Sequence, residues 1–227
     1  MRIAAGVEYN GSEFHGWQRQ INSLSVQQIV EQAISTVANH SVEVSCAGRT
    51  DAGVHAQGQV IHFDTEAQRE PRQWQLGINS NLGANVSITW VKTVSDEFHA
   101  RYAATARRYR YIILNRFAPP AVLVDKVCWV YHPMQAAAKH LLGKHDFTAY
   151  RAVACQSKSA IRTIESIQIE RSGEFLYIDI QANAFLQHMV RNIVGVLTTI
   201  GQGLKSTEWS REVLQVRDRT QGGITAP

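Results

Sequence analysis

The sequence predicts an α+β protein built from two ferredoxin-like, or RRM-like, halves whose mainly antiparallel strands form one continuous sheet. Three observations favour this class. Strand and helix patterns follow each other as β-α-β-β-α-β over residues 1–95, residues 96–227 have a similar rhythm, and no low-complexity linker separates them. With 227 residues, of which 44% are hydrophobic, the chain is long enough to bury a sizeable core.

The first half is predicted to contain four strands and two helices. The strands cover 2–9, 42–46, 58–65 and 86–94. The first helix, 25–39, carries one apolar stripe, and Ser25 with Gln28 forms a capping-box pattern at its start. The second helix, 71–82, begins at Pro71, a residue suited to the first helical turn.

The second half is predicted to contain four strands and three helices. The strands cover 107–114, 123–131, 161–171 and 174–183, and the last two form a hairpin. The helices cover 134–142, 184–200 and 205–218. The stretch 145–158 reads as a loop.

The net charge of +4 is only mildly basic, but the arginines are unevenly distributed. Five of them fall within 16 residues that contain no acid: Arg101, Arg107, Arg108, Arg110 and Arg116. Tyrosines are interleaved with them, which suits contacts to phosphates and unstacked bases. The alternative is an exposed strand face with solvated arginines, and the sequence leaves both interpretations open.

Several functional classes find no support in the sequence. No run of about 20 apolar residues or signal-peptide pattern is present, so a soluble cytoplasmic protein is expected. Cys46, Cys128 and Cys155 are odd in number and far apart, which argues against a disulfide framework. No metal-ligand spacing or phosphate-binding glycine loop occurs, so neither a metal nor a cofactor is expected.

The segment Gly48–His55, GRTDAGVH, joins two predicted strands and is the strongest candidate for a functional loop. It places Arg49 and Asp51 two residues apart between glycines that allow positive φ. A loop mounted on a rigid pair of strands is a common place for a catalytic side chain. The alternative is a structural turn closed by the Asp51 side chain.

Four segments together resemble the tRNA pseudouridine synthase A family: EYNGSEFHGWQRQ, GRTDAGVHA, FHARYAATARRYRYII and NAFLQHMVRNIVG. They occur in the family's order, and the resemblance covers essentially the whole chain. It implies the pseudouridine synthase fold, with a central cleft between the halves. It also implies an isomerase that converts uridine to pseudouridine at positions 38–40 of the tRNA anticodon stem-loop, acting as a homodimer without metal or cofactor.

The resemblance also implies roles for individual residues. Asp51 matches the nucleophile, and a carboxylate suits a reaction that breaks and remakes a glycosidic bond. Arg49 matches a residue that flips the base, and Tyr109 one that stacks on the uracil. On its pattern alone, Tyr109 reads rather as a core tyrosine on a strand.

The predicted helix 184–200 adds a second clue. It places His188, Arg191 and Asn192 at i, i+3 and i+4, which forms one polar patch on an otherwise apolar helix. A buried arginine needs a partner, and the resemblance implies that Arg191 forms a salt bridge with Asp51. A backbone carbonyl or Asp179 is the alternative partner.

The resemblance further implies contacts with RNA outside this constellation. The residues concerned are Arg69, Phe98, His99, Ala100, Arg101, Tyr102, Ala154, Cys155, Gln156, Ser157 and Lys158. Two features depart from the family's pattern. The helix after Pro133 is about one turn short, and a strand that lines the family's uracil pocket would follow Pro227. A non-catalytic RNA-binding protein of the same fold is therefore the alternative function, while a ferredoxin-like metabolic enzyme explains neither the arginine run nor the Asp51 loop.

Overall fold

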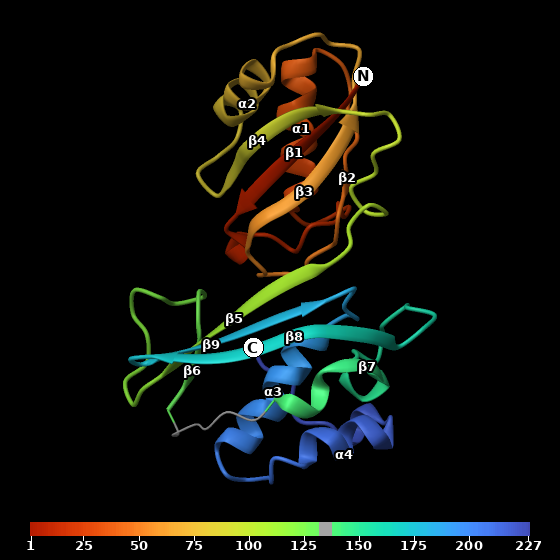
Figure 1. The fold of residues 1–227 in the computed structure, drawn as a ribbon. Coiled ribbons are helices and arrows are strands. Elements are labelled where there is room, and N and C mark those ends of the chain that lie inside the picture. The colour runs from red at the N-terminus through yellow and green to blue at the C-terminus, as the bar shows by residue number, and fades with distance from the viewer. Residues whose placement is uncertain (132–137) are drawn as a thin grey trace. The chain divides into compact units, whose positions relative to one another are not determined.

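A computed structural model of the chain describes residues 1–131 and 138–227. It confirms the predicted α+β class (Figure 1). The chain forms two compact units, Met1–Thr105 and Ala106–Pro227, called unit 1 and unit 2 below. In the described residues the strands form two sheets, one in each unit, rather than the single continuous sheet that was predicted.

The sheet of unit 1 has the order β2-β3-β1-β4, and every neighbouring pair is antiparallel. Its strands are β1 (Arg2–Tyr9), β2 (Ser45–Cys46), β3 (Ala56–Asp64) and β4 (Val86–Val94). This is the interleaved order of a ferredoxin-like half. The predicted strand 42–46 shrinks to two residues, because the Val44 amide donates to the Glu31 carboxylate of a helix instead of to a strand.

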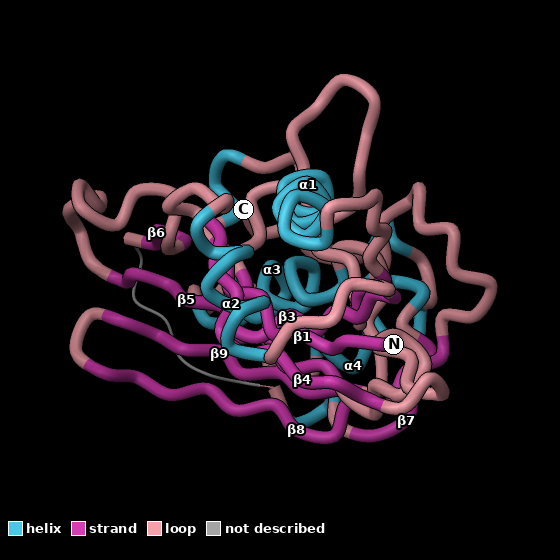
Figure 2. The backbone as a smooth tube through the Cα atoms, turned by 90° about the horizontal axis from the view of Figure 1, so that it is seen from above, coloured by secondary structure: helices cyan, strands magenta, loops and turns pink. Residues whose placement is uncertain are grey.

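Two helices cover one face of this sheet (Figure 2). Helix α1 (Val26–Ala38) begins as predicted, since the Ser25 side chain accepts a hydrogen bond from the Gln28 amide. Helix α2 (Pro71–Ser80) begins with a capping box between Glu70 and Gln73, which had not been predicted. The apolar stripes of both helices pack into one core with β1 and β3.

The sheet of unit 2 has the order β6-β5-β9-β8-β7. Its strands are β5 (Arg107–Asn115), β6 (Cys128–Val130), β7 (Gly143–Asp146), β8 (Ile161–Ser172) and β9 (Phe175–Ala182). Strand β6 pairs parallel to β5, and the other pairs are antiparallel. The predicted strand 123–131 is reduced to three residues, and β7 lies partly in the stretch that was predicted to be a loop.

The helices of unit 2 are shorter than predicted. Helix α3 (Met189–Gly201) packs its apolar face against the sheet, and α4 (Trp209–Val216) packs beside it. Of the predicted helix 134–142, residues 134–137 lie outside the described residues, and Lys139–Leu141 forms a 3₁₀ turn.

The segment 222–227 crosses α3 at close range. A Cβ atom on Gly195 would lie 1.7 Å from the Ile224 carbonyl oxygen, so only glycine permits this contact. The Ala226 amide also donates to the Arg191 carbonyl oxygen at 3.2 Å. The terminal segment is therefore packed against the helix that carries Arg191.

Candidate functional site

The Asp51 loop leaves the sheet of unit 1 directly after β2. The Ala47 amide still bonds the Val60 carbonyl oxygen at 2.8 Å, as in a strand pair. At Gly48 the buried side chain of Gln59 replaces the backbone pairing. Its amide group accepts a hydrogen bond from the Gly48 nitrogen and donates one to the Gly48 oxygen. Gln59 thus fixes the point at which the loop departs from β3.

Thr50 is held by the segment that follows β1. Its carbonyl oxygen accepts a hydrogen bond from the Trp17 amide at 3.0 Å. Its hydroxyl lies 2.8 Å from the hydroxyl of Tyr9, the last residue of β1. Gly16 makes this approach possible, since its φ is +90° and a Cβ atom there would lie 2.6 Å from the Thr50 oxygen.

The far side of the loop rests on the same segment. The Gly53 amide donates to the Phe14 carbonyl oxygen at 3.2 Å, and the Gly11 amide donates to His55 Nδ1 at 3.0 Å. A Cβ atom on Gly11 would lie 2.1 Å from the Val54 oxygen. The stretch EYNGSEFHGW therefore forms the support on which the loop lies.

Asp51 opens a tight turn within this loop. The Val54 amide donates to the Asp51 carbonyl oxygen at 3.2 Å, and Gly53 has a φ of +76°. Positive φ at the third position is typical of a type II turn. The backbone oxygen of Asp51 accepts the hydrogen bond that closes this turn. The Asp51 side chain is half-buried, and Arg49 is exposed.

In unit 2, Arg191 lies in the first turn of α3 and is half-buried. Its Nε donates to the Ala226 carbonyl oxygen at 2.8 Å, which is one of the two alternative partners considered from sequence. The other alternative, Asp179, binds different arginines. Because Asp51 belongs to unit 1, the ion pair between Asp51 and Arg191 stays a prediction.

Tyr109 on β5 is half-buried and meets Phe185 edge to face, with ring centroids 5.0 Å apart. Tyr111, two residues along the same strand, donates its hydroxyl to the Pro227 carbonyl oxygen at 2.7 Å. Burial raises the pKa of Tyr111, so this phenol stays protonated at neutral pH. Both tyrosines lie on the same side of β5.

The prediction that His188, Arg191 and Asn192 form one polar patch on a helix is wrong. His188 precedes α3 and has a φ of 57°, so it is not on the helix. Asn192 is buried, donates to the Tyr150 carbonyl oxygen and accepts from Arg219 and Thr225. Asn192 therefore joins parts of the core of unit 2.

The arginines of β5 bind other residues of unit 2. Arg108 and Arg110 both bind the Asp179 carboxylate, at 3.2 and 2.7 Å. The hydrogen bond from Arg110, opposed by burial, lowers the pKa of Asp179. The Arg110 guanidinium also lies 5.2 Å from the centroid of the Tyr177 ring.

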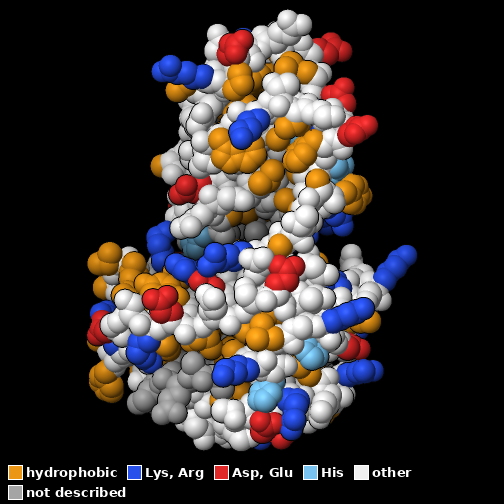
Figure 3. All heavy atoms as spheres, in the orientation of Figure 1, with side chains coloured by type: hydrophobic (Ala, Val, Ile, Leu, Met, Phe, Trp, Pro, Cys, Tyr) orange, Lys and Arg blue, Asp and Glu red, His pale blue; other side chains and the backbone are white. Residues whose placement is uncertain are grey.

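Two further arginines of the run have protein partners. Arg107 donates to the Asn183 carbonyl oxygen at 2.9 Å, and Arg116 pairs with Glu174 at 3.1 Å. Basic and acidic side chains are accordingly interspersed on the visible face of unit 2 (Figure 3). With Arg108 and Arg110, four arginines of the run therefore have protein partners, which neither interpretation from the sequence had included.

The segment Phe98–Tyr102, within unit 1, packs against His62 of β3 through tilted ring contacts. The His62 ring lies 4.6 Å from that of His99, which lies 4.2 Å from the ring of Tyr102. Buried Ala100 donates its amide to His62 Nδ1 at 3.2 Å. Burial, followed by the charge of His99, lowers the pKa of His62. Arg101 and Tyr102 are exposed, whereas Phe98 and His99 are half-buried.

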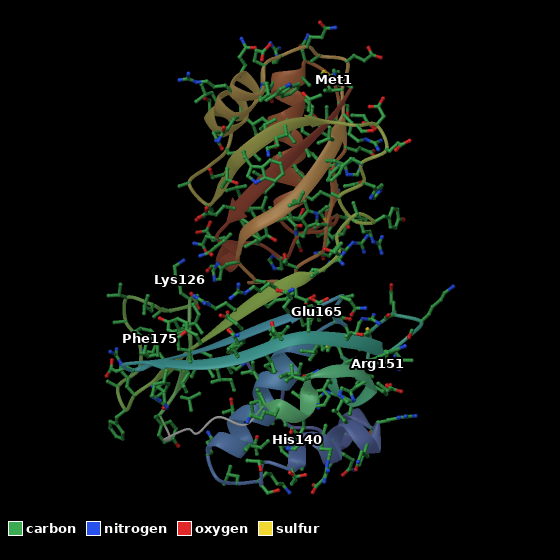
Figure 4. All side chains as sticks on the ribbon, viewed as in Figure 1. Met1, Lys126, His140, Arg151, Glu165 and Phe175 are labelled. Carbon is green, nitrogen blue, oxygen red and sulfur yellow. The ribbon has the colours of Figure 1, made fainter. Side chains whose placement is uncertain are left out.

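The segment Ala154–Lys158 is a loop in unit 2, after Arg151, at the end of the sheet opposite Lys126 and Phe175 (Figure 4). Ala154, Gln156 and Lys158 are exposed, whereas Cys155 is half-buried against the core. The Ser157 hydroxyl accepts a hydrogen bond from Arg162 at 2.9 Å.

Arg69 has a structural contact in unit 1. Its Nε donates to the Val37 carbonyl oxygen at 2.9 Å, in the last turn of α1. A cation at this end of a helix is favourable because it complements the unsatisfied carbonyl groups.

Two classes of feature are missing from the described part of the chain. It holds no group of three or more His, Cys, Asp or Glu side chains placed to bind a metal ion. Every helix in it is too short or too polar to cross a membrane.

Comparison with known proteins gives consistent matches. A protein-family model described as tRNA pseudouridine synthase matches residues 5–103 and 137–227. The chain belongs to this family. Proteins named tRNA pseudouridine synthase A from Pseudoalteromonas atlantica, Aeromonas hydrophila and Coxiella burnetii are 54%, 53% and 52% identical to it. Each match covers 100% of this chain, and 88%, 86% and 88% of the respective relative.

The matched segments include most of the candidate residues of this family member. Arg49, Asp51 and Arg191 lie within them, whereas Tyr109 lies between the two segments. The residues missed from sequence are Tyr9 and Gln59, which hold the Asp51 loop.

Proposed function

We propose that the protein is a cytoplasmic tRNA pseudouridine synthase that isomerises uridines at positions 38–40 of the anticodon stem-loop. The observation that carries the proposal is the GRTDAGVH loop of a chain of this family. Hydrogen bonds at Thr50 and at Gly53 hold this loop on both sides of Asp51. The name of each relative cited above agrees with a tRNA substrate.

Asp51 is the proposed nucleophile. The reaction breaks the bond from N1 of uracil to C1′ of the ribose and forms a bond from C5 to C1′. C5 loses a proton, and N1 gains one, so no oxidant or reductant is consumed. A carboxylate serves this reaction by attacking the sugar or the base, or by stabilising a cationic sugar.

Three residues assist Asp51 in this proposal. Exposed Arg49 occupies the space that the target base leaves when it turns out of its stack. Tyr109 stacks on the displaced uracil. Arg191 pairs with the Asp51 carboxylate and keeps it ionised, because a neighbouring positive charge favours the charged form.

The RNA is held outside this centre. Exposed Arg101 and Tyr102 in unit 1, and Gln156 and Lys158 in unit 2, offer charge, stacking and hydrogen bonds to an RNA hairpin. The protein acts as a homodimer, with one tRNA contacting both subunits. Several neighbouring uridines at one site require recognition of shape and phosphates more than of sequence.

The proposal is tested by mapping the product. A tRNA transcript carrying uridine at 38, 39 and 40 is incubated with the protein, treated with carbodiimide and analysed by primer extension. Pseudouridine at these positions is the expected result. Stable binding of tRNA without any pseudouridine would favour the alternative, a non-catalytic RNA-binding protein. Pseudouridine only in another arm would overturn the assignment of the target positions.

A further inference from the structure

We infer that Tyr9 and Thr50 form a positioning pair whose hydrogen bond sets the reactive placement of Asp51. This inference rests on the proposed function, because it assigns residues that serve the same nucleophile. Neither residue was singled out from the sequence, and Tyr9 is distant from the loop along the chain.

Tyr9 is a rigid base for such a contact. It ends β1, where it pairs with Ala56 of β3 on one side and Val86 of β4 on the other. Tyr9 is 3% exposed, and its ring centroid lies 5.9 Å from that of buried Trp17. Both neighbouring strands and the core therefore fix the direction in which the Tyr9 hydroxyl points.

Thr50 is held by its main chain and its side chain together. The Tyr9 hydroxyl lies 2.8 Å from Thr50 Oγ1, and the Trp17 amide donates to the Thr50 oxygen at 3.0 Å. A threonine is stiff at χ1, so a bond to its hydroxyl also orients its backbone.

Asp51 follows Thr50 directly and begins the turn that the Val54 amide closes. The carboxylate-bearing residue is thus fixed from both directions, and little backbone freedom remains at Asp51 itself. Loss of the Tyr9–Thr50 bond would widen the range of positions open to the Asp51 carboxylate. A reaction that needs close alignment loses rate when such a group is misplaced, even if substrate binding is unchanged.

The test uses conservative variants of the full chain in a single-turnover assay of tritium release from tRNA labelled at uridine C5. Tyr9→Phe removes only the hydroxyl, and Thr50→Val removes the other hydroxyl while keeping the shape. We expect each to lower the rate about tenfold, with the Kd for tRNA changed less than twofold. The double variant should lose little more than either single variant, because both remove one shared bond.

Two further variants separate positioning from stability. Thr50→Ser keeps the hydroxyl and should retain most of the rate. Tyr150→Phe removes another buried tyrosine hydroxyl, which donates to the Ser210 carbonyl oxygen at 2.9 Å within unit 2. It should lower the thermal midpoint about as much as Tyr9→Phe does and leave the rate unchanged.

The outcomes are distinct. A Tyr9→Phe rate equal to wild type, or a loss that Tyr150→Phe reproduces, would overturn the inference and leave the proposed function intact. A loss expressed only as weaker tRNA binding would also overturn it. A wild-type protein that releases no tritium would instead overturn the proposed function, and the positioning role with it.

Discussion

At the scale of single residues, the strongest feature is the way in which small and polar side chains hold the Asp51 loop. Gly11 and Gly16 bring one backbone against another, and Gln59 ties Gly48 to the neighbouring strand. The motif could be found in the sequence because glycines flank an aspartate. Its supports could not, since the bond from Tyr9 to Thr50 joins residues 41 positions apart and depends on the folded sheet.

Asp179 allows a prediction on pH and stability. Two arginines bind this carboxylate and lower its pKa, so its charge stabilises the folded state. We expect Asp179→Asn to lower the unfolding free energy at pH 7 by roughly 1 kcal/mol. The difference should persist above the unfolded pKa of about 4 and disappear as the pH falls through the lower folded pKa.

Urea unfolding at pH 7 and at acidic pH measures this difference. Glu43→Gln is the control, because the Glu43 side chain is exposed and forms no ion pair within the described residues. Equal urea midpoints for wild type and Asp179→Asn at pH 7 would contradict the stabilising role of Asp179.

At the scale of elements, the strands with a clear apolar pattern were predicted well. Elements that depend on contacts with distant parts of the chain were not. Strands β1 and β4 match their predicted bounds, because β1 is a short apolar run that ends before Asn10-Gly11 and β4 begins with alternating apolar residues. Strand β7 was missed because Gly143-Lys144-His145-Asp146 has no such alternation and is defined by pairing with β8. Helix α3 begins later than predicted because His188 has a φ of 57°, outside the right-handed helical region, so the helix cannot extend back through it.

The contact between α3 and the segment 222–227 gives a prediction at this scale. Gly195→Ala improves the intrinsic helix propensity of α3 by about 1 kcal/mol but places a methyl group against the Ile224 oxygen. We expect the clash to dominate and to lower the unfolding free energy by about 1–3 kcal/mol.

Gly58→Ala on β3 is the matched control, since nothing lies within 4 Å of a Cβ atom there. Its thermal midpoint should remain close to that of wild type. If Gly195→Ala were instead as stable as wild type or more stable, the close packing of the terminal segment on α3 would be refuted.

At the scale of the whole molecule, the charge pattern predicts which arginines bind RNA. The sequence showed one arginine run, but its members differ in their contacts: exposed Arg108 and Arg110 both bind Asp179, and exposed Arg101 lies 5.9 Å from the centroid of the Tyr102 ring. Ion pairs of this kind form between strands and cannot be read from the order of residues. The contacts of each arginine are therefore a better guide to RNA binding than the mildly basic net charge.

Salt dependence of tRNA binding tests this distinction. We expect Arg101→Ala to reduce the slope of log K against log salt by about one, because one phosphate contact is lost. Arg110→Ala should leave the slope unchanged. Fluorescence anisotropy at a series of salt concentrations gives both slopes, and equal reductions for the two variants would contradict the assignment.

The role of Asp51 is tested most directly by Asp51→Asn, which keeps the size of the side chain and removes its charge. Tritium release from tRNA labelled at uridine C5 is measured for wild type and variant, alongside the Kd for tRNA. We predict release by wild type, a loss of at least about a thousandfold in Asp51→Asn, and nearly unchanged binding. Equal release by the two proteins would contradict the role of Asp51 as the nucleophile.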